Sequence, residues 1–409
     1  MKFSKSSQLF LVSSIGLLVA ALLTACSITT IDYVFVASSS GIETYAVDSQ
    51  SGALRPGAAT VTSGVNSPVA MAVTSDYAHL YVANAGNNTV VHFAIGMNGE
   101  LSPKDTVTLS GTPVSLAVNT AGTYLYVTSP APPTSCSGPN PGATLTAYPL
   151  ASGTIGAASA PAALCVPQYA GDTIVPTGVT VLANNDAVFV TAYDQSAYNP
   201  GCTPAPACTP STANPGWVFS FVVGSGGSLA PAANSPYEAG VKPSALVSDP
   251  TDRFVYVTDY ASNELIGYTI LDGSTLSFLT NGPFKTGGQP SAIAMDPRGK
   301  FIYVTNALDS TVSPYAITLS NGTPTVALNL IGNQINPTDT EPVAIAVDPA
   351  LGRFVYTANH LDNSISGFRL DPNSGAVTPT QATPYNTGLK PTALVIVPHG
   401  NHATQSITP

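Results

Sequence analysis

Five residues that could do acid–base chemistry lie at or next to two fixed places of an internal repeat. One place lies directly before a proline that opens an apolar segment, and it holds Lys242, Glu341 and Lys390. The other ends an aromatic segment, where Asp259 stands, and His360 comes one residue after the same place in another copy. Carboxylates and imidazoles act as general bases, and an ammonium group can stabilise a developing oxyanion. These groups would suit hydrolysis of a carboxylic ester or lactone.

We therefore predict Glu341 or His360 as the catalytic base, with Lys242 or Lys390 as the electrostatic donor. In the alternative interpretation, Lys242 pairs with Asp259 and Lys390 with Glu341, as surface ion pairs that contribute little to stability. A cation held by the carboxylates and neighbouring asparagines is a further alternative, but we predict no metal and no cofactor. The predicted substrate-binding residues are Lys242, Asp259, Asn306, Asn359 and Lys390.

The repeat consists of two strand signals that each occur seven times. The first is a proline that opens an apolar strand, at Pro68, Pro113, Pro176, Pro243, Pro290, Pro342 and Pro391. The second is a strand with an aromatic residue, at Phe35, Tyr81, Tyr126, Phe189, Tyr256, Tyr303 and Tyr356. The chain opens with the second signal and closes with the first, as expected for a ring whose two ends share one unit.

Each copy continues with an alternating segment and a glycine-containing turn such as Asn98-Gly99 or Asp272-Gly273. Four short antiparallel strands per copy describe a propeller blade. We predict an all-β, seven-bladed β-propeller over residues 32–398, closed where the segment near Leu394 pairs with the one near Val34. Residues 399–409 are predicted as a tail. We expect His79, His92, His399 and His402 to lack partners and to be structural or solvated.

The strand order defines two faces of the ring. The strand-opening prolines, and the loops that follow the aromatic strands, lie on the face that we call top. The Asp-Pro turns at Asp249, Asp296 and Asp348 lie on the opposite, bottom face, where their carboxylates should cap the turns. The candidate acids and bases therefore converge at the top mouth of the central channel.

Composition narrows the partners. Only 8% of residues are charged and the net charge is −10, with no basic run beyond the N-terminus. Nucleic-acid binding needs several cations on one face, so we exclude it. We expect a monomer whose surface is wetted by hydroxyl and amide side chains.

The N-terminus has the features of an export signal. A short positive region precedes an apolar stretch from Leu9 to Leu23, which is shorter than the roughly 20 residues that span a bilayer. It ends in Leu23-Thr24-Ala25-Cys26, which resembles the lipobox of bacterial lipoproteins. We predict a signal peptide over 1–25, lipidation of Cys26 and a tether over 26–31; the alternative is an ordinary signal peptide with a chance cysteine. Several acyl chains would hold the protein at the bacterial cell envelope, at the outer membrane or periplasmic face.

Four further cysteines fit an exported protein with disulfides. Zinc is the rival interpretation, but no Cys-x-x-Cys pair is present. The first predicted pairing joins Cys202 to Cys208 and Cys136 to Cys165.

The repeat resembles the lactonase-type seven-bladed propellers, including the propeller 6-phosphogluconolactonases, and the surface propellers named for a Tyr-Val-Thr-Asn strand, here at 303–306. Enzymes of that family carry an Arg-His pair just after one strand-opening proline, whereas this chain has Ser244, Ser291 and Val343 after Pro243, Pro290 and Pro342. No catalytic residue is carried over from the family. The resemblance implies a lactonase-like hydrolase acting on a lactone or sugar-acid ester. The alternative function is a non-catalytic scaffold that binds an envelope protein or glycan.

Overall fold

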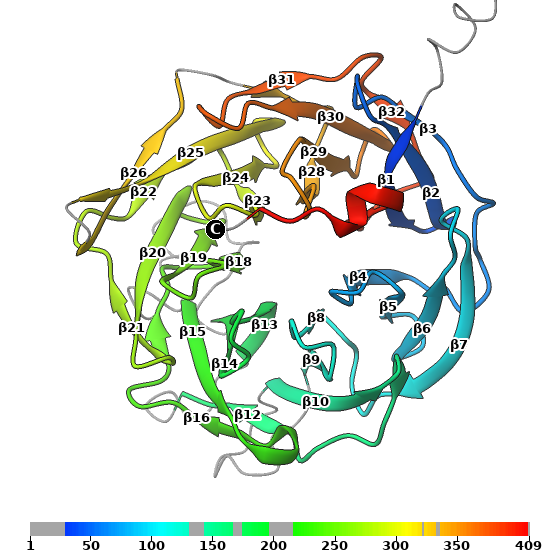
Figure 1. Cartoon of the computed structure of the whole chain (residues 1–409). Helices are drawn as coiled ribbons and strands as arrows, with labels where there is room; N and C mark the ends of the chain where they lie inside the picture. Colours follow the sequence, from blue (N-terminus) through cyan, green and yellow to red (C-terminus); the bar gives the residue numbers. More distant parts are fainter. Residues whose placement is uncertain are drawn as a thin grey trace, which may run out of the picture.

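Seven antiparallel sheets surround a central opening in the computed structural model (Figure 1), which describes residues 29–130, 143–166, 174–195, 216–320, 323–332 and 336–407. This confirms the predicted seven-bladed propeller. We number the blades from the one that contains both chain ends. The innermost strands are β33 (Ala393–Pro398), β4 (Pro68–Val73), β8 (Ser115–Val118), β13 (Ile174–Val181), β18 (Pro243–Ser248), β23 (Pro290–Met295) and β28 (Pro342–Val347).

The next three strands of each blade follow outward in chain order. The second strands are β1 (Thr30–Ser38), β5 (His79–Asn84), β9 (Tyr124–Pro130), β14 (Ala187–Asp194), β19 (Phe254–Asp259), β24 (Phe301–Asn306) and β29 (Phe354–Asn359). The third strands are β2 (Gly41–Asp48), β6 (Thr89–Ile95), β10 (Ala143–Ala151), β15 (Gly216–Val223), β20 (Glu264–Leu271), β25 (Thr311–Ser320) and β30 (Ser364–Leu370). The outer strands are β3 (Leu54–Pro56), β7 (Leu101–Thr108), β11 (Thr154–Ile155), β16 (Leu229–Pro231), β21 (Thr275–Phe278), β26 (Thr323–Leu330) and β31 (Val377–Pro379).

Five blades hold a fifth short strand that the sequence did not predict. It pairs with the third strand of its own blade, beyond the end of the outer strand. These strands are β12 (Ala162–Leu164), β17 (Tyr237–Glu238), β22 (Phe284–Lys285), β27 (Asn336–Pro337) and β32 (Tyr385–Asn386). They are segments that lead back toward the top face and the next blade.

The core lies between neighbouring blades. Second strands are buried on both faces because each is sandwiched between two other sheets; Val255, Tyr256 and Val257 are all inaccessible to solvent. Tyr303 of blade 6, for example, packs in one cluster with Val355 and Phe368 of blade 7. Strands of this kind favour β-branched and aromatic residues, which is what the repeat supplies.

The repeated tyrosines also link the blades through hydrogen bonds. The Tyr81 hydroxyl donates to the Gly153 carbonyl at 2.6 Å, Tyr303 to Gly375 at 2.9 Å, and Tyr356 to Gly52 at 2.6 Å. Each acceptor belongs to the glycine turn of the next blade, and Gly153, Gly375 and Gly52 all have positive φ. The two recurring sequence signals, tyrosine and turn glycine, therefore meet across every one of these interfaces.

The first and last strands close the ring. Strand β33 pairs antiparallel with β1, with Val34 opposite Ile396 and Val36 opposite Leu394. Sheet order β3-β2-β1-β33 makes blade 1 from both ends of the chain. The predicted closure is confirmed.

The start of β1 and the end of β33 meet at the bottom face, because Asp32 lies opposite Pro398. The C-terminal segment continues into the short 3-10 helix η3 (Gly400–Thr404), drawn in red near the central opening in Figure 1. The second 3-10 helix of the described residues is η2 (Ser225–Gly227). No helix in the described ranges is long and apolar enough to cross a membrane.

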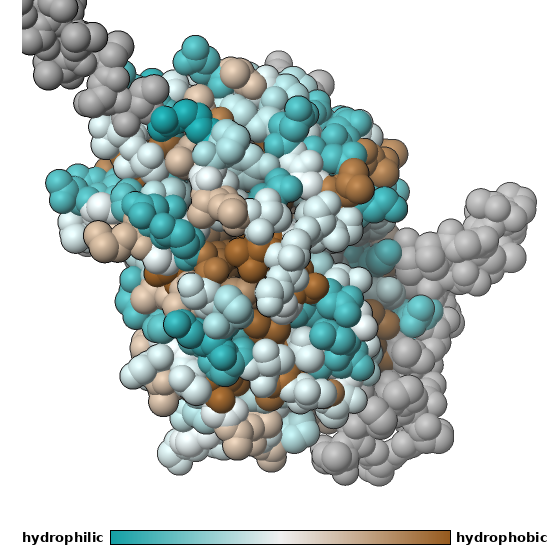
Figure 2. All heavy atoms as spheres, turned by 90° about the vertical axis from the view of Figure 1, so that its right-hand side faces the viewer, coloured by the Kyte–Doolittle hydropathy of each residue, from teal (hydrophilic) through white to brown (hydrophobic). Residues whose placement is uncertain are grey.

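Bottom turns after three inner strands are capped as predicted. Asp249 accepts the amide of Thr251, Asp296 those of Lys300 and Phe301, and Asp348 those of Ala350 and Arg353. The outer surface matches the expectation from composition. Figure 2 shows many residues of intermediate hydropathy between separate strongly hydrophilic ones, with apolar side chains visible in between.

Candidate functional site

The structure brings the two predicted rings of residues together at the top mouth. In blade 7 the His360 amide donates to the Glu341 carbonyl at 2.9 Å, and in blade 5 the Tyr260 amide donates to the Lys242 carbonyl at 2.9 Å. Residues before strand-opening prolines adopt a left-handed backbone in several blades, with φ of 55° at Gln289, 58° at Glu341 and 54° at Lys390. Non-glycine residues rarely adopt this conformation. The mouth is therefore a set of tightly bonded turns rather than loose loops.

Lys242 lies in an aromatic environment between blades 4 and 5. Its Nζ lies 4.7 Å from the ring centroid of Tyr260 and 5.5 Å from that of Tyr193. Burial lowers the pKa of the Lys242 ammonium, while cation–π contact holds the charged form in place. The Tyr260 hydroxyl donates to Oε1 of Gln289 in blade 6 at 2.9 Å.

The same group of side chains extends toward blade 7. Burial raises the pKa of the Tyr260 hydroxyl, and the nearby Glu341 carboxylate raises it further. The ion pairs within 4.0 Å that join described residues include neither Lys242 with Asp259 nor Lys390 with Glu341. The alternative of two rim ion pairs is therefore wrong. We call Lys242, Tyr260, Gln289, Glu341 and His360 the mouth cluster.

His360 has a defined tautomer. Its Nδ1 lies 3.0 Å from the Pro391 carbonyl oxygen, which can only accept. Nδ1 therefore carries the hydrogen, so in the neutral imidazole the lone pair is on Nε2. A half-buried imidazole with this orientation has the form of a general base.

Three predicted substrate-binding residues have structural roles. Asp259, Asn306 and Asn359 are completely buried. Asp259 accepts four amides, from Val241, Lys242, Ala261 and Ser262. The amide groups of Asn306 and Asn359 donate to hydroxyls of the third strand, such as Thr311 and Ser364. These three side chains shape the loops of the mouth, and their contact with a substrate stays a prediction. Of the other predicted contacts, Lys390 is exposed and Lys242 is half-buried.

Serine and threonine hydroxyls occupy the positions just after the strand-opening prolines. Ser244 donates to the Pro290 carbonyl at 2.6 Å, Ser291 to Pro342 at 2.5 Å and Thr392 to Pro68 at 2.7 Å. Each bond joins the inner strand of one blade to that of the next. At these three positions the chain therefore has links between blades.

The cysteine predictions fall mostly outside the described residues. Cys26, Cys136, Cys202 and Cys208 all lie there, and among the four candidate disulfide cysteines only Cys165 is described. Its sulfur is not free. Lipidation and the disulfide pairing stay predictions.

Two histidines that we expected to lack partners form a chain of hydrogen bonds in blade 2. His79 Nδ1 lies 2.9 Å from His92 Nε2, and His92 Nδ1 lies 2.5 Å from Asp105 Oδ1. Asp105 also accepts the amide of Ile155 in blade 3 at 2.9 Å. The expectation was wrong because β6 and β7 bring Asp105 beside His92, which spacing in the sequence did not indicate.

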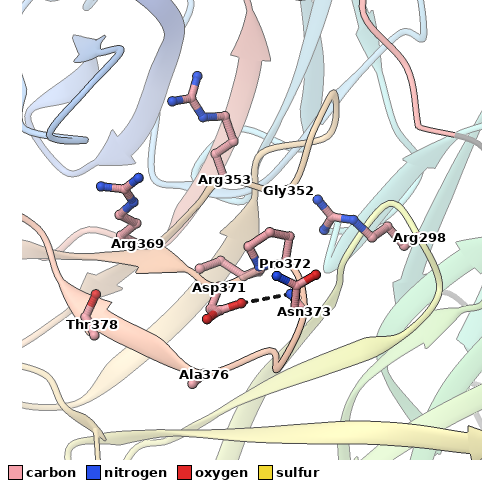
Figure 3. Close-up of a pocket in the computed structure, with 10 residues that line it drawn as sticks. Arg298, Gly352, Arg353, Arg369, Asp371, Pro372, Asn373, Ala376 and Thr378 are labelled. Atoms are coloured by element: carbon pink, nitrogen blue, oxygen red, sulfur yellow. Dashed lines mark hydrogen bonds between the residues drawn. The ribbon is translucent and has the colours of Figure 1, made fainter.

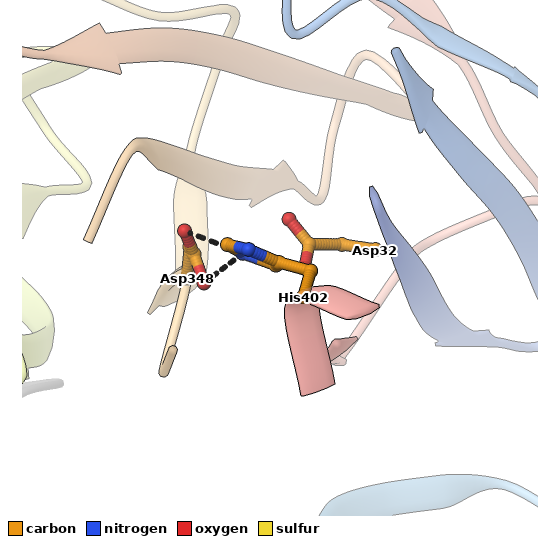
Figure 4. Close-up of side chains that lie close together, drawn as sticks. All are labelled: Asp32, Asp348 and His402. Atoms are coloured by element: carbon orange, nitrogen blue, oxygen red, sulfur yellow. Dashed lines mark hydrogen bonds and ion pairs between the residues drawn. The ribbon is translucent and has the colours of Figure 1, made fainter. Parts of the chain in front are cut away.

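His402 was also expected to be solvated, yet it is buried against two carboxylates on the bottom face (Figure 4). Its Nε2 lies 3.1 Å from Asp348 Oδ1 and 3.4 Å from Asp32 Oδ1. Burial, with a smaller contribution from Asp348, raises the pKa of Asp32 to about 8. Burial alone would lower the pKa of His402, but the two carboxylates raise it to about 9. We call Asp32, Asp348 and His402 the seam cluster.

A pocket of about 500 Å³ lies beside the bottom turns of blades 6 and 7 (Figure 3). Arg298, Arg353 and Arg369 line it. Arg298 pairs with Asp296 and donates to the Leu351 carbonyl, and Arg353 donates to the Ser49 carbonyl. Two of the three guanidinium groups are thus engaged by the chain, while Arg369 is exposed.

Comparisons with known proteins agree with this architecture. No curated protein matches the sequence significantly. Among solved structures, a putative 6-phosphogluconolactonase from Bacteroides uniformis has 17% identity and a TM-score of 0.69, covering 90% of this chain and 100% of its own. A periplasmic gluconolactonase from Pseudomonas aeruginosa has 19% identity and a TM-score of 0.67, covering 90% and 99%. At these identities the likeness shows the fold alone.

A family model described as lactonase, 7-bladed beta-propeller, matches residues 27–132 and 232–404. The matched ranges contain the two strand signals, the ring closure and every member of the mouth cluster. The chain belongs to the lactonase family of seven-bladed β-propellers.

Proposed function

We propose that this protein is a lipid-anchored hydrolase of the bacterial cell envelope that opens a lactone at the top mouth of its channel. The observation that carries the proposal is His360, whose Nδ1–H is fixed on the Pro391 carbonyl so that Nε2 is left as a base. Its loop is hydrogen-bonded to that of Glu341. Glu341 is the alternative base, and half-buried Lys242 is the cation of the mouth cluster.

The chemistry would proceed by activation of water. Nε2 of His360 takes a proton from a water molecule as the water oxygen bonds to the lactone carbonyl carbon. The Lys242 ammonium donates to the oxyanion that develops on the carbonyl oxygen. The ring C–O bond then breaks, and the imidazolium returns its proton to the departing alkoxide. A hydroxy acid leaves.

The mouth favours a lactone without a phosphate group. Its candidate cations are two lysines, Lys242 and Lys390, while a phosphate is bound most specifically by arginine forks. The arginines of blades 5 to 7 that the structure describes lie at the bottom. Because one structural neighbour is a gluconolactonase, an unphosphorylated sugar lactone such as a gluconolactone is the first substrate to test.

Replacing His360 by glutamine is expected to lower kcat/KM for lactone opening by about 10²–10⁴-fold, since a positioned general base contributes that much. Glu341→Gln is expected to lower it less, by about tenfold, if His360 is the base. A pH-stat measurement on a panel of sugar lactones checks both values. His79→Gln, on the opposite face, is the matched control and should leave the rate unchanged. Equal rates for all three variants and the parent would reject the catalytic assignment.

The second candidate function is a non-catalytic scaffold, and a specific observation favours it. The polar groups of Asp259, Asn306 and Asn359, and the hydroxyls of Ser244 and Ser291, are used to build the mouth. Few groups remain for chemistry. If the parent protein opens no lactone of the panel, the scaffold replaces the hydrolase as the proposed function.

Envelope attachment is proposed from Cys26 together with the position of the chain ends. The first strand begins at the bottom face, so a short tether would direct this face to the membrane and the top mouth outward. Cys26→Ser is expected to move the protein from the membrane pellet to the soluble fraction after cell lysis, because its acyl chains are lost. Detergent-free fractionation and immunoblotting measure this. A serine variant that still sediments with the membrane would contradict lipid anchoring.

A further inference from the structure

The seam cluster has the donors and the geometry of a metal site. We propose that Asp32, Asp348 and His402 bind a divalent transition ion, Zn²⁺ or Mn²⁺, that fastens the closure of the ring. The three residues come from different elements: Asp32 from β1, Asp348 from the turn after β28, and His402 from η3. One ligand atom from each can be chosen so that all lie within 4.8 Å of one another.

The spacing of the ligand atoms fits a small tetrahedral ion. Bonds of 2.0–2.1 Å to nitrogen and oxygen in a tetrahedron place the ligand atoms about 3.3–3.4 Å apart. His402 Nε2 lies 3.4 Å from Asp32 Oδ1 and 3.1 Å from Asp348 Oδ1. The two distances from His402 Nε2 therefore already match those of a tetrahedral site, and the two carboxylates would close around the ion from either side of the ring.

Asp32 supplies independent support for a ligand. Its side chain is fully buried, neither of its carboxylate oxygens has a hydrogen-bond partner, and its ionic contact with His402 is a long one of 3.4 Å. Buried carboxylates are normally paired, hydrogen-bonded or bound to a metal, because an isolated charge is costly away from water. In Figure 4 the Asp32 carboxylate lies beside the His402 ring, on the side away from Asp348.

His402 is oriented as metal-binding histidines are. Its Nδ1 lies 2.9 Å from Oε1 of Gln405, an acceptor, so Nδ1 carries the hydrogen. Nε2 points at the two carboxylates; without a metal it carries a proton directed at them, in keeping with the raised pKa of His402, and a metal ion would replace that proton. A second-shell hydrogen bond on the remote ring nitrogen is the usual device that fixes the tautomer of a metal ligand.

The equivalent turns of the neighbouring blades are neutralised differently. Asp249 of blade 5 pairs with Arg253 at 2.7 Å, and Asp296 of blade 6 pairs with Arg298 at 3.1 Å. In blade 7 the corresponding Arg353 directs its guanidinium to the Ser49 carbonyl instead. Asp348 therefore faces His402 and Asp32 instead of a guanidinium group. A bound cation would take the place that arginine has beside the aspartates of blades 5 and 6.

One imidazole and two carboxylates favour Zn²⁺ or Mn²⁺ over Ca²⁺ and Mg²⁺, which prefer oxygen ligands alone. The two carboxylates balance the charge of the ion. All three side chains are buried, as in a structural site rather than one open to substrate. The bound ion would join β1, the last blade and the C-terminal segment, which is independent of the chemistry proposed for the top mouth.

The test is metal binding by the full-length protein after removal of metals with a chelator. Isothermal titration with Zn²⁺, and with Mn²⁺ in parallel, is expected to give about one ion per chain. At 100 times the dissociation constant, Zn²⁺ should raise Tm by roughly 3 °C for a chain of this size. Asp32→Asn and His402→Gln should each abolish the bound ion and the rise in Tm.

Asp32→Asn separates a ligand from a merely structural residue. Since Asp32 loses no hydrogen bond and only its 3.4 Å contact with His402, the metal-free variant should stay folded with a Tm close to that of the metal-free parent, and the response to Zn²⁺ should disappear. His399→Gln, three residues before His402, is the control and should bind like the parent. Binding of much less than one ion per chain, or equal binding by Asp32→Asn, would overturn the proposal. The three side chains would then be held together only by protonated His402 between the two carboxyl groups.

Discussion

Replacing Ile396 by aspartate is expected to open the ring and to cost more than about 4 kcal/mol of unfolding free energy. Ile396 is buried in β33 opposite Val34, and it packs with Val36, Phe354 and Tyr356 of blades 1 and 7. An aspartate there would be a buried charge without a partner, which is among the most destabilising single changes. The ring closure would be lost because the charge lies in the middle of the β1–β33 pairing.

Urea unfolding followed by circular dichroism measures this loss. Ile396→Val is the matched control, because it keeps the strand and removes one methylene group, at a cost of about 1 kcal/mol. If the aspartate variant unfolds at the same urea concentration as the valine variant, β33 does not close the ring in solution.

Asp259→Asn is expected to cost about 2–3 kcal/mol of stability, although the change is nearly isosteric. The carboxylate accepts four backbone amides, and an asparagine would turn an NH₂ group toward at least one of them. Buried donors without acceptors carry the full cost of their desolvation. The loss should appear as a lower urea midpoint, measured as above.

A second change in the same blade should restore part of the stability. In blades 2, 6 and 7 this place is asparagine, and the register partner in the third strand offers a hydroxyl: Asn84 with Thr89, Asn306 with Thr311, Asn359 with Ser364. The register partner of Asp259 is Glu264, which has no hydroxyl group. Glu264→Thr would provide the missing acceptor and lose only an exposed pair with Lys285.

We therefore expect Asp259→Asn with Glu264→Thr to recover roughly 1 kcal/mol relative to Asp259→Asn alone. Glu264→Thr by itself is the control and should change stability by less than about 1 kcal/mol. If Asp259→Asn leaves the urea midpoint unchanged but weakens lactone hydrolysis, Asp259 is a substrate contact after all.

The fold was predictable because its determinants are local and repeated. Each blade shows its proline, its aromatic strand and its glycine turn within one stretch of chain, and the order of the two signals at the ends implied closure. The pairing of Val34 with Ile396 is the long-range contact that this order implies.

The sites were less predictable because they depend on contacts that do not repeat. Asp259 could contact a substrate or accept hydrogen bonds within its loop. Its structural role is visible only from the four backbone amides that donate to its carboxylate. One sequence signal does indicate the structural role of the asparagines: in blades 2, 6 and 7 an asparagine at the end of the second strand is followed five residues later by serine or threonine. The mouth cluster was recovered in part, since Lys242, Glu341 and His360 were named, but Tyr260 and Gln289 were not.

The seam cluster had no local signal at all. Asp348 looked like its counterparts Asp249 and Asp296, and His402 stood in a segment without strand pattern. Only the arrival of the C-terminal segment beneath the ring places His402 beside Asp32. A lone difference, the arginine of blade 7 turning to Ser49 rather than to Asp348, is visible only in three dimensions.

The position of the seam has a consequence for biosynthesis. Strand β1 is among the first segments to leave the ribosome, yet its partner β33 is among the last. The edge of β1 that pairs with β33 therefore stays exposed throughout translation, even after the other six blades are complete. A chain that ends before β33 would keep the apolar edge of β1 exposed. Chaperones and quality-control proteases recognise exposed apolar surface of this kind, so completion of β33 would mark a chain that can fold.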